Sequence, residues 1–320
     1  MRLESSTEVD EREIREGTVV CSENHRHSIR HGIIDLLSEK NELIEKERNG
    51  LKSFALKMRN EGFADADLLT LFERGSGPYW DAARLNLNQA VQASSPRAGD
   101  SLLEIGANNC WASGWFSAKG IDVTALDISD IELQGLRSAD VFMNNQGTHF
   151  ERVMSSMTSL PFVDGRFRYV FCSASLHHNK PEQLQSTLTE IYRVLQPEGM
   201  LIVINEPTRG IIDRRLSFGK EVEEYEGNEN IYSMREYRGM MKRAGFSRIR
   251  MLAPDSFYAM VTSGRYANYA RKNLFLKIGF ASFVWLWKRG LQNTLKFVSF
   301  PLVGHLFGGM PFNAVATKNV

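Results

Sequence analysis

The middle of the chain alternates short apolar runs with longer stretches of helical periodicity, and this alternation constrains the fold more than any other feature. The apolar runs, each bounded by turn residues, lie at 101–105, 122–126, 168–173, 200–204 and 248–252. Helical patterns separate them at 111–119, 181–195 and 233–244. This order predicts an α/β fold with a mainly parallel sheet covered by helices on both faces. Ligands of such sheets bind at the carboxyl ends of the strands.

The region before this pattern predicts a different organisation. The first seventeen residues are polar and acidic without an apolar stretch, so we expect a loosely attached leader and not a secretory signal. Apolar residues recur at helical spacing over 28–60, which predicts two amphipathic helices separated near Gly50, and another helix is expected over 79–93. We therefore predict a leader with a helical cap at 1–95, and the α/β domain at 96–320.

Composition excludes some classes of protein. The 39 basic and 38 acidic side chains nearly cancel, so no overall charge favours nucleic acid as a partner. The three cysteines show no CxxC spacing, which favours reduced thiols and a cytoplasmic location over a zinc site or disulfides. His25, His27 and His31 have no accompanying frame of carboxylates or cysteines, so we predict no metal there.

The loop after the first apolar run, in "LLEIGANNCWASGW", begins with a single glycine, Gly106. A dinucleotide fingerprint would require two more glycines, where Asn108 and Trp111 stand, and no phosphate-binding lysine follows. Asp127 lies where an acid can accept hydrogen bonds from ribose hydroxyls. These residues indicate an adenosine without a pyrophosphate. A strand end with a surface acid explains the spacing equally well.

Four blocks occur in order: "LLEIGANNCWASGWFSAKGIDVTALDIS", "SLPFVDGRFRYVFCSASLHH", "LTEIYRVLQPEGMLIVINEP" and "YSMREYRGMMKRAGF". Together they resemble class I S-adenosylmethionine-dependent methyltransferases of the type-11 group, over residues 97–252. The resemblance implies a Rossmann-like sheet of seven strands, mostly parallel, with an antiparallel last strand at 312–318 and a late helical insertion at 253–311. The sequence departs from the family at Asn108 and Cys110, where glycines are usual, and at Arg168, where an aspartate is customary.

The resemblance also implies how S-adenosylmethionine is bound. Glu104 and Gly106, with the backbone of Ala107 and Asn108, would hold the methionine end, and Asp127 would bind the ribose.

The remaining cofactor contacts follow the next two strands. Ile128 would pack on the adenine, and Ser156 and Met157 would flank it, although the family often has an acid at the position of Ser156. Ser173 and Leu176 would line the methyl-transfer site.

Three further residues are candidates for catalysis. Methyl transfer needs a general base only where the acceptor loses a proton, and His177 or His178 could serve, with His177 favoured. Glu206 could bind an acceptor hydroxyl or amine. The alternatives are structural: the histidines close a strand end, and Glu206 caps a helix or forms a salt bridge.

The last part of the chain has an unusual charge pattern, because 256–320 contains basic residues and no Asp or Glu. Its apolar run "LFLKIGFASFVWLW" is too short for the ~20 residues that span a bilayer. Either the insertion is a lid over an apolar acceptor pocket, or 271–307 contacts an anionic membrane surface. Tyr79, Trp80 and Arg84 form either a lid over the cofactor or part of the core.

The function that these observations predict is methyl transfer from S-adenosylmethionine to a small or lipid-like acceptor, at oxygen or carbon. A catalytically silent binding protein of the same fold is the alternative, because fold does not guarantee chemistry. The oligomeric state stays open.

Overall fold

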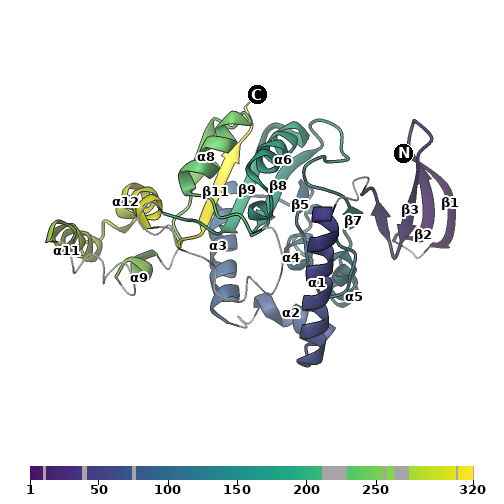
Figure 1. The fold of residues 1–320 in the computed structure, drawn as a ribbon, viewed down its shortest axis with the longest axis horizontal. Coiled ribbons are helices and arrows are strands. Elements are labelled where there is room, and N and C mark those ends of the chain that lie inside the picture. The colour runs from purple at the N-terminus through teal and green to yellow at the C-terminus, as the bar shows by residue number, and fades with distance from the viewer. Residues whose placement is uncertain are drawn as a thin grey trace.

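The computed structural model describes residues 1–9, 12–37, 42–73, 77–210, 229–254, 257–262, 274–307 and 309–319. These residues form one sheet of eleven strands, in the order β1-β2-β3-β4-β7-β6-β5-β8-β9-β11-β10 (Figure 1). The sheet therefore has four strands more than the seven that the sequence predicts, all four at the N-terminus. The other strands form the core: β7 Glu151–Met154, β6 Asp122–Asp127, β5 Ser101–Ile105, β8 Phe167–Ser173, β9 Leu195–Glu206, β11 Phe312–Thr317 and β10 Arg248–Met251.

The pairing within this core confirms the predicted Rossmann-like arrangement. Strands β7, β6, β5, β8 and β9 are mutually parallel. Strand β11 is antiparallel to both of its neighbours, β9 and β10, as expected for the last strand. The chain passes from β5 outward to β7 and then returns to β8 on the other side of β5. The switch point of the sheet therefore lies between β5 and β8, where α/β proteins place their ligands.

Both faces of the core sheet are buried, because side chains of successive strand residues point to opposite faces. In β5, Leu102 packs into one hydrophobic cluster, and Leu103 and Ile105 pack into the other. The first cluster includes helices α1 Glu42–Asn60, α2 Asp65–Glu73, α3 Pro78–Ser94, α4 Trp111–Ser117 and α5 Ala139–Gln146. The second includes α6 Pro181–Val194 and α8 Met234–Arg243.

The prediction for the N-terminal residues is wrong. In place of a loose leader, the chain forms β1 Arg2–Val9, β2 Ile14–Val20, β3 Arg26–Arg30 and β4 Ile33–Asp35. These strands make an antiparallel ribbon, and β4 continues the core sheet by pairing in parallel with β7. Two helices over 28–60 were also expected, but α1 begins at Glu42 and runs through Gly50 without a break.

Distant ion pairs explain why a charged N-terminal sequence is ordered. Arg152 of β7 is 1% exposed and donates hydrogen bonds to Glu13 at 2.6 and 2.7 Å and to Asp140 at 2.7 Å. Arg15 donates two further hydrogen bonds to Asp140, both 3.0 Å long. The charges that indicate an exposed leader when read locally are thus paired with one another and with residues more than a hundred positions away.

The late insertion is helical, as predicted, in its described parts: α9 Phe257–Thr262, α11 Leu274–Lys288 and α12 Gln292–Phe307. Phe257 is fully buried and lies 5.5 Å from the ring of Phe300 and 6.0 Å from that of Phe283. These contacts fix the insertion against α8 and the second cluster, at the end of the molecule opposite β1 (Figure 1). Within the described residues, none of the helices combines the length and the apolar character that crossing a bilayer requires.

Candidate functional site

A cavity of about 420 Å³ opens at the carboxyl ends of β5, β6 and β8, beside the switch point. It brings together every predicted cofactor contact except Leu176: Glu104, Gly106, Ala107, Asn108, Asp127, Ile128, Ser156, Met157 and Ser173. Leu176 is fully buried and packs into the second cluster. Tyr79 and Trp80, at the start of α3, also line the cavity, whereas Arg84, the third residue of the lid hypothesis, does not. Trp80 also packs against the first cluster, as the core alternative expects.

The structure of the loop after β5 explains why it has one glycine, Gly106, and why Trp111 follows it. Gly106 has a φ of 69°, and a Cβ atom there would lie 2.5 Å from Cβ of Ser175, so only glycine fits. Asn108, with a φ of 43°, takes the left-handed conformation that asparagine tolerates better than most residues. The Trp111 ring stacks on Phe72 of α2 at 4.5 Å, so this indole fills the core between helix and sheet.

Asp127 closes the same loop from the neighbouring strand. Its Oδ2 accepts a hydrogen bond from the Asn108 amide at 2.8 Å, and its Oδ1 accepts one from the Ser129 amide at 2.9 Å. Burial raises the pKa of Asp127 to about 6, although these amide hydrogen bonds oppose the shift. Each oxygen has a second lone pair, so the carboxylate can still accept hydrogen bonds from a ligand.

Glu104 is the second carboxylate of the cavity wall and is 2% exposed. It accepts a hydrogen bond from the Ser113 hydroxyl of α4. Burial raises the pKa of Glu104 to about 8, against the effect of the Ser113 hydrogen bonds. In the described part of the chain no Lys, Arg or His forms an ion pair with it, so this carboxyl group suits a ligand that carries its own positive charge.

Ser156, Met157 and Ser173 line the cavity, and each contacts the side chain of another residue. The hydroxyl groups of Ser156 and Thr158 lie 2.7 Å apart, and Met157 Sδ accepts a hydrogen bond from Asn179 at 3.0 Å. Ser173 accepts one from Asn205 at 3.3 Å. They leave an apolar thioether and small hydroxyls facing the cavity.

Glu206 holds the turn after β8 together and does not line the cavity. Its Oε1 accepts hydrogen bonds from the amides of Ser175 and Leu176, at 2.8 and 2.9 Å. Its Oε2 accepts one from the His177 amide at 3.1 Å and lies 2.9 Å from His177 Nδ1. Burial alone would raise its pKa, but the hydrogen bonds from His177 and the backbone hold the pKa below its usual value. This fully buried carboxylate therefore fits the salt-bridge alternative.

The two histidines occupy different positions. His177 is 7% exposed, lies behind the cavity wall, and approaches Glu229 through Nε2 at 3.2 Å. Burial opposes its protonation, but Glu206 and Glu229 together raise its pKa to about 9. His178 lines the cavity, and burial together with the charge of His177 lowers its pKa to about 4. Of the three predicted catalytic residues, only His178 reaches the cavity.

Two carboxylates near the histidines were not predicted. Glu47 lies on α1, whose residues Leu43, Ile44, Leu51 and Phe54 also line the cavity. This helical stripe is visible in the sequence, but it is indistinguishable there from an ordinary core-facing stripe. Glu47 Oε1 lies 3.1 Å from His178 Nδ1. Glu229 lies just before the sequence block that begins at Tyr232, but no local pattern indicates a role for it.

Comparison with known proteins finds similarity to methyltransferases. Residues 103–203 match the family model described as a methyltransferase domain. The chain is 30% identical over 122 residues to a malonyl-(acyl-carrier protein) O-methyltransferase of Erwinia billingiae, covering 37% of this chain and 44% of that protein. It is 31% identical over 107 residues to an uncharacterized methyltransferase of Synechocystis, covering 33% and 47%. The chain thus spans less than half the length of these two relatives.

Solved structures resemble the fold over a longer stretch. A chain from the Haloferax volcanii complex of a methyltransferase activator with a methyltransferase gives a TM-score of 0.52 at 15% identity, covering 85% of this chain and 97% of that one. A phosphoethanolamine N-methyltransferase of Haemonchus contortus, in complex with phosphomonomethylethanolamine and S-adenosylhomocysteine, gives 0.50 at 17%, covering 86% and 60%. The comparisons thus place a methyltransferase domain at residues 103–203, within a fold of the Rossmann-like methyltransferase kind.

Proposed function

We propose that the protein transfers a methyl group from S-adenosylmethionine to a small or lipid-like acceptor. The observation that carries this proposal is the lining of one cavity by Glu104, the Gly106 turn and Asp127 at the strand ends, with His178 in the same wall. Its volume of about 420 Å³ lies within the range of ~300–1,000 Å³ that is usual for small-molecule sites.

The cofactor would use the two buried carboxylates differently. Asp127 would accept hydrogen bonds from ribose hydroxyls through its free lone pairs. Glu104 would pair with the ammonium group of the methionine moiety, the kind of cation that its surroundings lack. Ile128 and Met157 would contact the adenine, and Ser156 would meet its edge with a hydroxyl in place of an acid. The cavity needs no glycine-lined phosphate site, because this cofactor has no phosphate.

The chemistry asked of the protein is mainly alignment and exclusion of water, since the sulfonium already activates the methyl group. An oxygen or carbon acceptor must also lose a proton. His178 is the predicted residue that can contact such an acceptor, because it lines the cavity. His177 and Glu206 would act through the turn that carries it, as positioning residues.

Calorimetry with S-adenosylmethionine and S-adenosylhomocysteine tests the cofactor part of the proposal. We expect both to bind the full chain, and Asp127→Ala to weaken binding about tenfold or more, the effect of ~1.4 kcal/mol of lost hydrogen bonding. Asp122→Ala is the matched control, because Asp122 begins the same strand and is exposed. If neither compound binds, the result would instead support the catalytically silent alternative.

The described insertion supports a membrane-associated acceptor more than a lid. No described residue of 253–311 lines the cavity. Five large apolar side chains of α11, α12 and their connection are 46–63% exposed: Ile278, Trp285, Leu291, Val298 and Leu302. Lys277, Lys288 and Arg289 are exposed beside them, and 256–320 contains no acid. Apolar and basic side chains in this mixture suit an anionic bilayer surface. Residues 271–273 of the predicted contact lie outside the described residues.

A further inference from the structure

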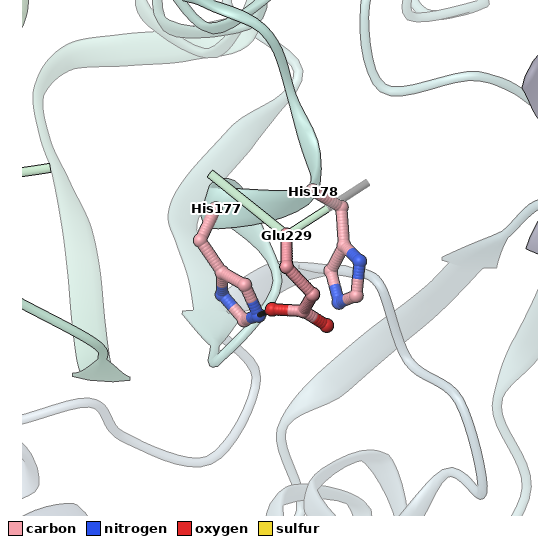
Figure 2. Close-up of side chains that lie close together, drawn as sticks. All are labelled: His177, His178 and Glu229. Carbon is pink, nitrogen blue, oxygen red and sulfur yellow. Dashed lines mark ion pairs between the residues drawn. The ribbon is translucent and has the colours of Figure 1, made fainter. Parts of the chain in front are cut away.

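His177, His178 and Glu229 form a cluster of metal-ligand groups beside the cavity. One ligand atom from each lies within 4.8 Å of the others. The two imidazole rings are 4.3 Å apart between centroids, and Figure 2 shows the carboxylate of Glu229 between them. In the parts of the chain that the structure describes, this is the one group of three such residues.

Both ring nitrogens of His177 face a carboxylate. Nδ1 lies 2.9 Å from Glu206, and Nε2 lies 3.2 Å from Glu229. A neutral imidazole has a single N–H, so one of these two nitrogens would present a lone pair to a carboxylate oxygen. Either a second proton or a cation is therefore needed between the imidazole and the carboxylate.

The pairing of His177 with Glu206 is of a kind that is common in metal sites. A ligand histidine usually donates its other N–H to a carboxylate, which fixes the ring and leaves the first nitrogen for the metal. Glu206 is fixed by backbone amides and can do this for His177. Glu47 Oε1 lies 3.1 Å from His178 Nδ1, although the two atoms do not form a hydrogen bond.

The charges at this site also favour a cation. Three carboxylates, Glu47, Glu206 and Glu229, surround two imidazoles. Among described residues, the ion pairs of Glu206 and Glu229 are made with His177 alone. A single imidazolium therefore compensates one of the charges of Glu206 and Glu229, whereas a divalent ion would compensate both.

We propose that His177, His178 and Glu229 bind a divalent transition-metal ion of the zinc class. Two imidazole nitrogens and one carboxylate are a usual ligand set for zinc with an open fourth position. Ligand atoms ~2 Å from the ion lie roughly 3.4 Å apart in tetrahedral geometry, so the group must contract by at most about 1.4 Å. Glu229 is partly exposed, which leaves its side chain room to move.

The open position would serve the acceptor. His178 belongs to the cavity wall, so an ion bound to it is accessible from the cavity. An acceptor hydroxyl that coordinated the ion would become more acidic, which selects acceptors with an ionisable oxygen. This role rests on the proposed methyl transfer, whereas binding of the ion does not.

The test is direct metal binding by the full chain. After treatment with a chelator, we expect one equivalent of Zn²⁺ by calorimetry, and visible absorption bands typical of tetrahedral coordination when Co²⁺ replaces it. His178→Ala and Glu229→Gln should each weaken Co²⁺ binding about tenfold or more, and Glu206→Gln should weaken it about 10-fold to 100-fold as an outer partner. His25→Ala, at an exposed histidine, is the matched control and should change nothing.

Several outcomes separate this proposal from others. If no stoichiometric binding occurs, or if His178→Ala and Glu229→Gln bind Co²⁺ like the unaltered protein, the proposal fails and His177 is an imidazolium shared by two glutamates. Circular dichroism and S-adenosylmethionine binding of each variant verify that it is folded. Metal binding without methyl transfer would leave this site standing and contradict the proposed function, and cofactor binding without metal binding would do the reverse.

Discussion

At the scale of single residues, Glu206 shows how one buried carboxylate organises the turn that carries the histidines. Its oxygens accept hydrogen bonds from three successive backbone amides and contact His177 Nδ1. The turn is therefore fixed by a residue from the adjacent strand, and its geometry does not depend on local propensity. In the sequence Glu206 is also compatible with contacting the acceptor, because both roles place an acid at the end of a strand.

Replacing Glu206 by glutamine should lower the free energy of unfolding. The new amide group would point its own N–H groups at backbone donors, leaving buried groups unsatisfied at a cost of about 1–3 kcal/mol. Urea denaturation followed by circular dichroism measures this change. Glu198→Gln is the control, because Glu198 lies exposed on the same strand. Equal stability of the two variants would show that the turn does not need the Glu206 carboxylate.

Glu104 predicts a pH dependence of stability in the free protein. Burial raises the pKa of Glu104 to about 8, so the folded protein favours the protonated carboxyl group. The free energy of unfolding is therefore highest below the pKa of Glu104 in the unfolded chain, and it falls as pH rises from there through 8. Glu104→Gln should therefore melt at a higher temperature than the unaltered protein, with a difference that grows between about pH 5 and pH 8. Calorimetric melting curves over this range measure it. A difference independent of pH would contradict the raised pKa.

At the scale of elements, α11 and α12 have two apolar sides with different surroundings. One side is packed against the domain, where Phe300 of α12 is 1% exposed. The other side presents Trp285 and Val298, which are 57% and 63% exposed. Arg289 lies 4.9 Å from the Trp285 ring, which places a cation beside the exposed indole. A helix pair that only covered its own domain would have no need of the second apolar side.

We predict that the chain binds vesicles containing anionic lipid and that Trp285→Ser with Leu302→Ser reduces this binding several-fold. The loss follows from the apolar area removed from the interface, worth about 25 cal/mol per Å². Co-sedimentation at increasing salt measures both the apolar and the electrostatic contributions. Val163→Ser is the control, because Val163 is 73% exposed and lies in a loop outside the insertion. If vesicle binding is unchanged by salt and by both serine substitutions, the result would contradict a membrane role for these helices.

At the scale of the whole molecule, much of the core sheet was predictable. The strands β5, β6, β8 and β9 are buried on both faces, so they appear as apolar runs in the sequence. Strand β7, with the sequence ERVM, was missed, because Arg152 occupies an inward position that would normally hold an apolar residue. The N-terminal ribbon was also missed, because its charged residues indicate an exposed segment, and the partners that neutralise some of these charges are distant in the sequence.

The site follows the same division. The residues directly after strands were predicted, because parallel strands bring their carboxyl ends to one edge of the sheet. Glu47 and Glu229 were not, because a helix stripe and a distant segment bring them to the histidines only in the folded chain.

The Arg152 network should account for a large part of the stability of the joined sheet. Arg152→Met would remove the fully buried cation between Glu13 and Asp140 and leave them with Arg15 alone, which is more exposed. Because Arg15 still compensates part of the charge, we expect a loss of stability smaller than the ~3–5 kcal/mol of an unpaired buried charge. Arg26→Met is the matched control, because the pair of Arg26 with Glu4 is largely exposed and solvent screening leaves such a pair with little effect on stability. Chemical unfolding of both variants measures the difference. A similar loss in the two would show that β4 does not need Arg152 to remain joined to β7.

The ribbon of β1 to β4 stands at the opposite end of the sheet from α11 and α12 (Figure 1). A fluorescent label at the first residue would therefore be remote from any bilayer that these helices touch. Energy transfer from such a label to a dye in the lipid would then report the orientation of the protein relative to the bilayer surface. The same separation allows the protein to be immobilised through β1 while α11 and α12 stay accessible.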